Sequence, residues 1–123
     1  MLGNNNAIAT IAVKNLDVAK KFYRDTLGLK LVSDEMGTNS YKTGNTTMLV
    51  YKSDYAGSNK ATSATWMVDD VEDIVKTLKA KGVIFEHYDL PGLTRTGDIH
   101  VAGKHKLAWF KDPDGNIHHL NQR

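Results

Sequence analysis

The sequence predicts an α+β fold in which two βαβββ units form a curved mixed sheet around a concave cleft, with the helices on the outer face. Three observations support this prediction. A stretch beginning at Ala9 resembles one beginning at Ala64, a second pair of similar stretches closes each half, and both halves show β-rich runs around one amphipathic helix. Repeated segments of this kind indicate one supersecondary unit per repeat.

The two halves align over two separate matches. ATIAVKNLDVAKKFYRDTLGLKL in the first half aligns with ATWMVDDVEDIVKTLKAKGVIF in the second, and YKTGNTTML aligns with FKDPDGNIHHL, so that Leu49 meets Leu120. The spacing between equivalent residues grows between the matches, which requires an insertion of about sixteen residues in the second half. The segment DLPGLTRTGDIHVAGKH, with its glycines and proline, is the expected place.

In the first half, residues 8–13 form a β-rich run that predicts a strand. The apolar residues that follow recur at the spacing of one helix face: Ala19, Phe22, Tyr23 and Leu27. Gly28 is expected to end this helix. Strands are then predicted at 29–33, 40–43 and 46–51, the last two joined by the tight turn TGN.

The second half repeats this order. A strand is predicted at 63–68, and a helix follows with its apolar stripe at Val71, Ile74, Val75 and Leu78, ending at Gly82. Strands are predicted at 83–87, 107–111 and 116–121, with DPDGN as the turn before the last. Asp112 and Asp114 are expected to cap the backbone of that turn.

The chain has 123 residues, which suits a single domain spanning 1–123, with the first unit at about 7–52 and the second at about 62–122. The absence of cysteine excludes a disulfide scaffold and a zinc-thiolate site. Sixteen Lys and Arg against fourteen Asp and Glu leave a formal net charge of +2, so no nucleic-acid partner is expected. No apolar run reaches the length of a membrane span, and we expect a cytoplasmic protein that binds no membrane.

One helix covers only one face of its sheet, so the other face of each unit is left open. Alternation along the first strand places Ile8 and Thr10 on the open face. In the second unit it places Ser63, Thr65 and Met67 there and puts Trp66 under the helix. The small and mildly polar residues of the open faces favour a ligand cavity.

Three segments, IAVKNLDVAKKFYRDTLGLKLV, MVDDVEDIVKTLKAKGV and FKDPDGNIHHL, resemble the vicinal oxygen chelate superfamily of glyoxalases, bleomycin-resistance proteins and dioxygenases. Their order and spacing match the internal repeat. The resemblance covers almost the whole chain, and it implies two units around one cleft and a homodimer.

Metal-using members of this superfamily hold a divalent ion with residues of the first and last strand of each unit. The resemblance places the first-strand histidine on Ile8 and Ser63, and the last-strand glutamate on Met48 and His119. Only His119 can coordinate, whereas a catalytic ion usually has three protein ligands. We therefore expect no cofactor, and a divalent metal with unusual ligands is the alternative.

The sequence thus favours a protein that sequesters a small apolar or aromatic molecule, its only expected partner besides a second copy. The expected ligand-binding residues are Ile8, Thr10, Met48, Ser63, Thr65, Met67, Trp109 and His119. Core packing is the other interpretation of the methionines, and Trp109 faces either the cleft or a helix. The alternatives are a lyase, isomerase or dioxygenase that uses non-standard metal ligands or His119 as a general base, and an interaction module without a ligand.

The remaining histidines have less specific interpretations. His118 points away from His119 on a regular strand and is therefore expected to be structural. His100 and His105 flank a turn in the inserted segment, and together with His119 they are a possible substitute metal site.

Overall fold

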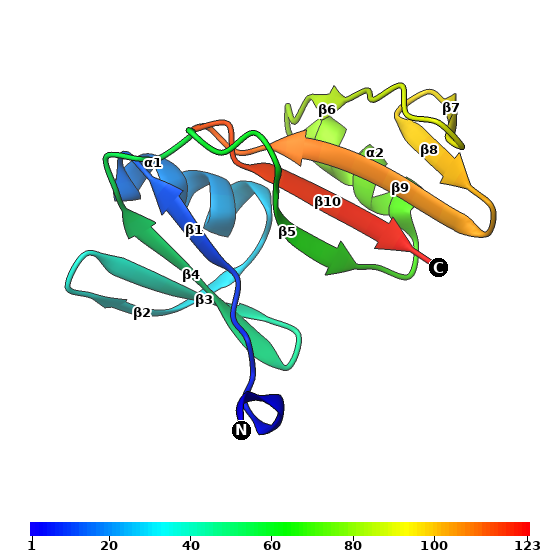
Figure 1. The fold of residues 1–123 in the computed structure, drawn as a ribbon. Helices are drawn as coiled ribbons and strands as arrows, with labels where there is room; N and C mark the ends of the chain where they lie inside the picture. The colour runs from blue at the N-terminus through cyan, green and yellow to red at the C-terminus, as the bar shows by residue number, and fades with distance from the viewer. The chain divides into compact units, whose positions relative to one another are not determined.

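The computed structural model describes residues 1–123, and its contacts divide the chain into two compact units (Figure 1). The first unit comprises Met1–Lys60 and Pro113–Asn116, and the second comprises Ala61–Asp112 and Ile117–Arg123. No helix is long and apolar enough to cross a membrane.

The first unit has the predicted order of elements. After a 3-10 turn, η1 (Leu2–Asn4), come β1 (Thr10–Val13), α1 (Leu16–Lys20), a π-helical turn η2 (Lys21–Thr26), β2 (Lys30–Glu35), β3 (Thr38–Thr43) and β4 (Thr46–Lys52). Helix α1 begins where the Asn15 side chain accepts hydrogen bonds from the backbone N–H groups of Asp17 and Val18. Gly28, at φ +73°, follows the π-helical turn, as predicted for a residue that ends the helix.

The sheet of the first unit has the strand order β1-β4-β3-β2, with β1 parallel to β4 and the other pairs antiparallel. The face beneath the helix is the core of this unit, and its fully buried strand residues are Ile11, Val13, Asn39, Tyr41, Met48 and Val50. The Tyr23 ring of η2 lies 5.8 Å from the Tyr41 ring. The helical segment thus covers one face of this sheet and leaves the other face open.

The second unit repeats this arrangement and adds a hairpin. Its elements are β5 (Thr62–Met67), α2 (Val71–Ala80), β6 (Phe85–Glu86), β7 (Thr94–Thr96), β8 (Ile99–Ala102), β9 (His105–Lys111) and β10 (Ile117–Gln122). The strand order is β5-β10-β9-β8-β7, and β6 pairs with β9 as well. Strands β5, β10, β9 and β6 correspond to β1, β4, β3 and β2, which confirms the predicted repeat.

Trp66 and His118 lie on the helix-covered face of this sheet, as predicted. The Trp66 Nε1–H donates to His118 Nδ1 over 3.0 Å, and the His118 ring stacks on Phe110 at 5.1 Å. His118 is completely buried, whereas its neighbour His119 is only partly so. His118 therefore belongs to the core, and His119 belongs to the opposite face.

The inserted segment is more ordered than the sequence predicted. The glycines and proline only located the insertion and no strand was predicted within it, but β7 and β8 form an antiparallel hairpin, and β8 pairs with the first part of β9. The turn residues Gly97 and Asp98 join two strands of only three and four residues. Strands this short are hidden from pattern analysis because alternation needs a longer run to become visible.

The turn DPDGN makes contacts beyond its own hairpin. The Asp114 carboxylate accepts a hydrogen bond from the Lys14 backbone N–H over 3.3 Å, and the Asn116 amide donates to the Ala12 carbonyl over 2.8 Å. These bonds hold Pro113–Asn116 against the end of β1, so the turn is part of the first unit. The sequence predicted only bonds within the turn.

Candidate ligand-binding site

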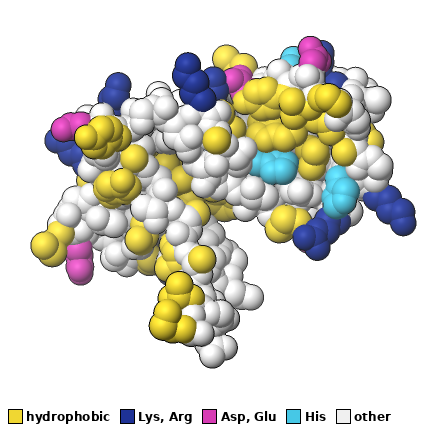
Figure 2. Space-filling view, viewed as in Figure 1, with side chains coloured by type: hydrophobic (Ala, Val, Ile, Leu, Met, Phe, Trp, Pro, Cys, Tyr) yellow, Lys and Arg dark blue, Asp and Glu magenta, His cyan; other side chains and the backbone are white.

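The open face of the second sheet carries most of the residues that the sequence singled out. On β10, His119 lies directly between Thr65 of β5 and Trp109 of β9. The alternation of strands adds Ser63 and Met67 to this face, and His100 of β8 pairs with Leu107, two residues before Trp109. In Figure 2, hydrophobic side chains and a histidine gather over β9 and β10.

Trp109 is the centre of an aromatic cluster on this face. The His119 ring stacks on its indole at 4.7 Å with an interplanar angle of 10°, and the rings of Tyr88 and His100 approach it edge-on at 5.1 and 4.8 Å. These contacts leave Trp109 only 9% exposed. The structure therefore resolves the open choice for Trp109, which lies on the face away from the helix.

Several polar atoms of this cluster are buried without a hydrogen-bond partner. They are His119 Nε2, Tyr88 Oη, His100 Nδ1 and Asn121 Oδ1. His100 is held through its other nitrogen, because Nε2 accepts a hydrogen bond from the Tyr88 backbone N–H over 3.0 Å. Buried polar groups are nearly always paired in native proteins, so such a concentration on one face requires an explanation.

Burial also keeps the cluster uncharged at neutral pH. It lowers the pKa of His119 and that of His100, because each charged ring would lose its hydration on this face. Burial raises the pKa of the Tyr88 phenol. Glu86 and Lys111, the two charges that act on Tyr88, form an ion pair of 3.0 Å. This face therefore suits an uncharged ligand.

The structure brings together five of the eight predicted ligand-binding residues: Ser63, Thr65, Met67, Trp109 and His119 lie on this one face. Ile8 and Thr10 belong to the first unit, where both are exposed and Ile8 lines a hollow of about 530 Å³. A common cleft of the two units remains a prediction.

The prediction for Met48 is wrong. Met48 pairs with Tyr41, lies in the core of the first unit and is only 2% exposed. Thr10 pairs with Leu49 just as Thr65 pairs with His119, so Leu49 is the counterpart of His119. Counting from the turn glycine gave an alignment displaced by one residue, and such a displacement moves a strand residue to the other face.

Sequence reasoning did not assign Tyr88 and Asn121 to the site, and it considered His100 only as a metal ligand. Tyr88 immediately precedes the inserted segment and His100 lies within it, and since that segment has no counterpart in the first unit, the repeat could not place them. Asn121 is two residues after His119, and alternation from that histidine was a usable signal for it. His105 is exposed at the start of β9.

The residues present do not fit the divalent ion that the superfamily resemblance implies. Ile8 and Leu49 offer no donor atom, and Ser63 and His119 leave at most one strong ligand. Nowhere in the chain do three or more His, Cys, Asp or Glu residues gather as a metal site would require. We derive no chemical step through a metal.

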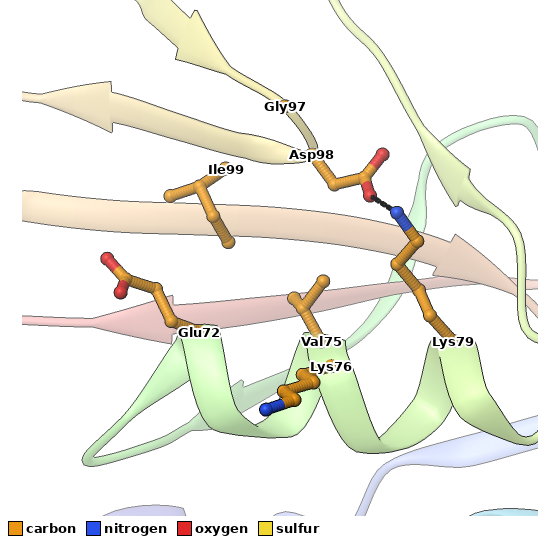
Figure 3. A pocket seen from close by; sticks show the side chains of 7 residues that line it. All are labelled: Glu72, Val75, Lys76, Lys79, Gly97, Asp98 and Ile99. Carbon is orange, nitrogen blue, oxygen red and sulfur yellow. Dashed lines mark hydrogen bonds and ion pairs between the residues drawn. The ribbon is translucent and has the colours of Figure 1, made fainter.

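Another hollow, about 370 Å³ in volume, lies in the second unit between α2 and the turn of the inserted hairpin (Figure 3). At one end the Asp98 carboxylate binds Lys79 Nζ and His87 Nε2, both at 2.7 Å. Glu72, at the other end, pairs with Lys106 at 2.8 Å. Its carboxylates are thus already neutralised, and the pairs tie the hairpin to α2.

The chain belongs to the Glyoxalase/Bleomycin resistance protein/Dioxygenase superfamily, whose family model matches residues 6–120. The match confirms the resemblance that the three sequence segments indicated. No curated protein matches the chain.

Several solved structures share the fold. A glyoxalase family protein from Enterococcus faecalis is 19% identical with a TM-score of 0.75, over 98% of this chain and 99% of the other. TnmS3, an antibiotic binding protein from Streptomyces sp. CB03234, is 23% identical with a TM-score of 0.66, over 96% of both chains. The fosfomycin resistance protein FosX from Listeria monocytogenes is 14% identical with a TM-score of 0.71, over 97% of this chain and 93% of the other.

Proposed function

We propose that this protein sequesters a small, planar, uncharged aromatic or apolar molecule on the open face of the second sheet, without a metal. The single observation that carries the proposal is the Trp109–His119 stack, with unpartnered polar atoms buried around it. Each such atom costs about 1–3 kcal/mol when nothing satisfies it. A ligand with a few polar groups on an aromatic body removes that cost.

The proposed ligand is aromatic because of the geometry around Trp109. A ring that stacks on the His119 imidazole extends the Trp109–His119 stack, while Tyr88 and His100 hold the indole from its edges. The polar atoms are covered in the free chain, so binding requires a side-chain movement on this face. The existence of an antibiotic binding protein with this fold supports the proposal.

The two tryptophans allow a direct test, because Trp66 lies under α2 and Trp109 lies on the proposed site. A Trp66→Phe variant reports on Trp109 alone, and a Trp109→Phe variant reports on Trp66 alone. Uncharged planar probes such as a naphthoquinone, a coumarin and an anthraquinone are titrated with EDTA present. We expect quenching in the first variant and none in the second.

Thermal unfolding gives a second measurement of the same binding. A probe at a hundredfold excess over its Kd stabilises the protein by about 2.7 kcal/mol. His119→Ala should abolish this stabilisation, whereas His105→Ala, which changes an exposed histidine of β9, should leave it unchanged. Failure of every probe to stabilise the protein, or binding that EDTA removes, would contradict the proposal.

We also propose that the protein acts as a cytoplasmic homodimer, as the superfamily resemblance implies. Sedimentation equilibrium at protein concentrations between 1 and 100 µM tests the dimer, because a dimer with a dissociation constant in or below this range is populated there. A monomer throughout this range would contradict it.

One observation favours proton abstraction as a second candidate function. His119 is neutral at pH 7 because burial lowers its pKa, and its Nε2 atom has no partner, so this nitrogen is available as a general base. The test measures whether the protein catalyses the exchange of a carbon-bound proton next to a carbonyl for solvent deuterium. His119→Gln should stop this exchange. No observation favours a metal-dependent lyase, isomerase or dioxygenase.

A further inference from the structure

The hollow of about 530 Å³ in the first unit has a lining unlike that of the aromatic face. It lies at the end of the unit where β3 turns into β4, and the residues that matter here are Ile8, Val32, Lys42, Asn45, Thr46 and Thr47. Amides, hydroxyls and apolar groups surround one ammonium group, and no carboxylate lines the hollow. A cationic site without an anion of its own is suited to an anionic ligand.

A second lysine stands beside the first. Lys30 of β2 lies directly opposite Lys42 of β3, so both side chains project from the same face, and neither takes part in an ion pair. Like charges directly opposite each other destabilise a sheet. Strands β2 and β3 thus hold two adjacent positive charges that repel each other, and a bound anion would relieve that repulsion.

The acidic residues of β2 do not compensate this pair. Asp34 lies opposite Asn39 on the helix-covered face, where it pairs with Lys20 of α1 at 3.2 Å. Glu35 is at the far end of β2, opposite Thr38. The positive charge of Lys30 and Lys42 is therefore unopposed on the open face.

A β-bulge supplies the apolar part of the hollow. The register between β2 and β3 shifts between Leu31 and Ser33, so that Val32 is the extra residue and has no partner opposite it. Bulges turn side chains out of the regular alternation, and they are frequent beside binding sites. Val32 lines the hollow with Ile8, and the two side chains are 47% and 41% exposed.

We propose that this hollow binds an oxyanion, a carboxylate or a phosphate, joined to a short apolar body. Lys30 and Lys42 bind the oxyanion by charge-assisted hydrogen bonds, and the hydroxyl of Thr47, which lies opposite Lys42, completes its donors. Val32 and Ile8 contact the apolar body. The hollow belongs to the first unit and the aromatic face to the second, and this proposal does not depend on the function proposed for that face.

Titration of the ¹⁵N-labelled protein with hexanoate, hexyl phosphate and hexanol tests the proposal. We expect both anions to shift the backbone signals of Thr46 and Thr47 and to bind at least tenfold more tightly than hexanol. The tighter of the two anions identifies the oxyanion. The Trp109 signals should stay unchanged, so failure here and failure of the proposed function are distinguishable.

Charge variants separate the site from general attraction to a basic protein. Lys42→Met should weaken hexanoate binding about tenfold, because a charge-assisted hydrogen bond is lost. Lys52→Met removes an equal charge from the exposed end of β4, beyond the hollow, and should change the affinity less than twofold. Without a ligand, Lys30→Met should raise the melting temperature by relieving the repulsion.

Three results would overturn the proposal. The first is equal binding of hexanol and the anions, and the second is an equal effect of Lys42→Met and Lys52→Met. The third is a set of shifted signals that lies outside the first unit.

Discussion

The proton affinity of His118 sets how the stability of this protein depends on pH. Burial lowers the pKa of His118 from its ordinary 6.5 to about 4, because the charged ring would lose its hydration in the core. In the unfolded chain the ring has its ordinary pKa. Between pH 6.5 and 4, therefore, the unfolded chain binds a proton that the folded chain does not, and folding becomes less favourable as the pH falls.

The size of this effect follows from the two pKa values. Their difference corresponds to about 3 kcal/mol, all of it lost near pH 4, and about 2 kcal/mol is lost by pH 5. His118→Asn removes the titrating ring and keeps an acceptor for the Trp66 indole N–H. The variant should therefore lose about 2 kcal/mol less than the natural protein between pH 7 and pH 5.

Urea unfolding at pH 7 and pH 5, followed by circular dichroism, measures the difference. His100 and His119 also have lowered pKa values and contribute in the same direction, but they are present in both proteins and cancel. His105→Asn, which changes an exposed histidine, serves as the control and should behave like the natural protein. Equal losses for the natural protein and His118→Asn would refute the reasoning.

Three further changes have defined outcomes. Gly57→Ala should lower the free energy of unfolding, measured in urea, clearly more than Gly92→Ala does. Both glycines have positive φ, but only at Gly57 would the new Cβ meet a backbone carbonyl. Gly92→Ala should cost about 1–2 kcal/mol. Asn15→Ala removes the cap of α1 and should cost about 1 kcal/mol by the same measurement. Asp98→Asn weakens the ties of the inserted hairpin and should shift the fluorescence of Trp109 in a protein that lacks the other tryptophan, and an unchanged spectrum would contradict this.

The order of elements was predictable because each signal is local. The helical stripe around Tyr23, the glycine after each helix and the tight turns fix where elements begin and end, and the structure confirms them. Alternation also placed Trp66 under the helix and His118 on the opposite face from His119. These features depend only on a residue and its near neighbours in sequence.

The rest depends on pairing between strands, which a single sequence does not contain. Met48 was misplaced because the two turns differ in length, and only the register with β1 shows that Leu49 is the counterpart of His119. Tyr88 reaches Trp109 because β8 pairs with β9 and positions His100 beside it. No pattern within the inserted segment indicates that pairing.

The contact between Asn116 and Ala12 spans 104 residues of sequence and has a consequence for biosynthesis. The first unit includes Pro113–Asn116, so it cannot be completed until Asn116 has left the ribosome. Residues 1–60 are therefore made before the turn that completes their unit, and β1 lacks these partners until that turn is made. Contacts this distant slow folding, because the loop between them must be closed first. A gene truncated between the two units would encode a fragment that lacks Pro113–Asn116 and therefore cannot complete the first unit.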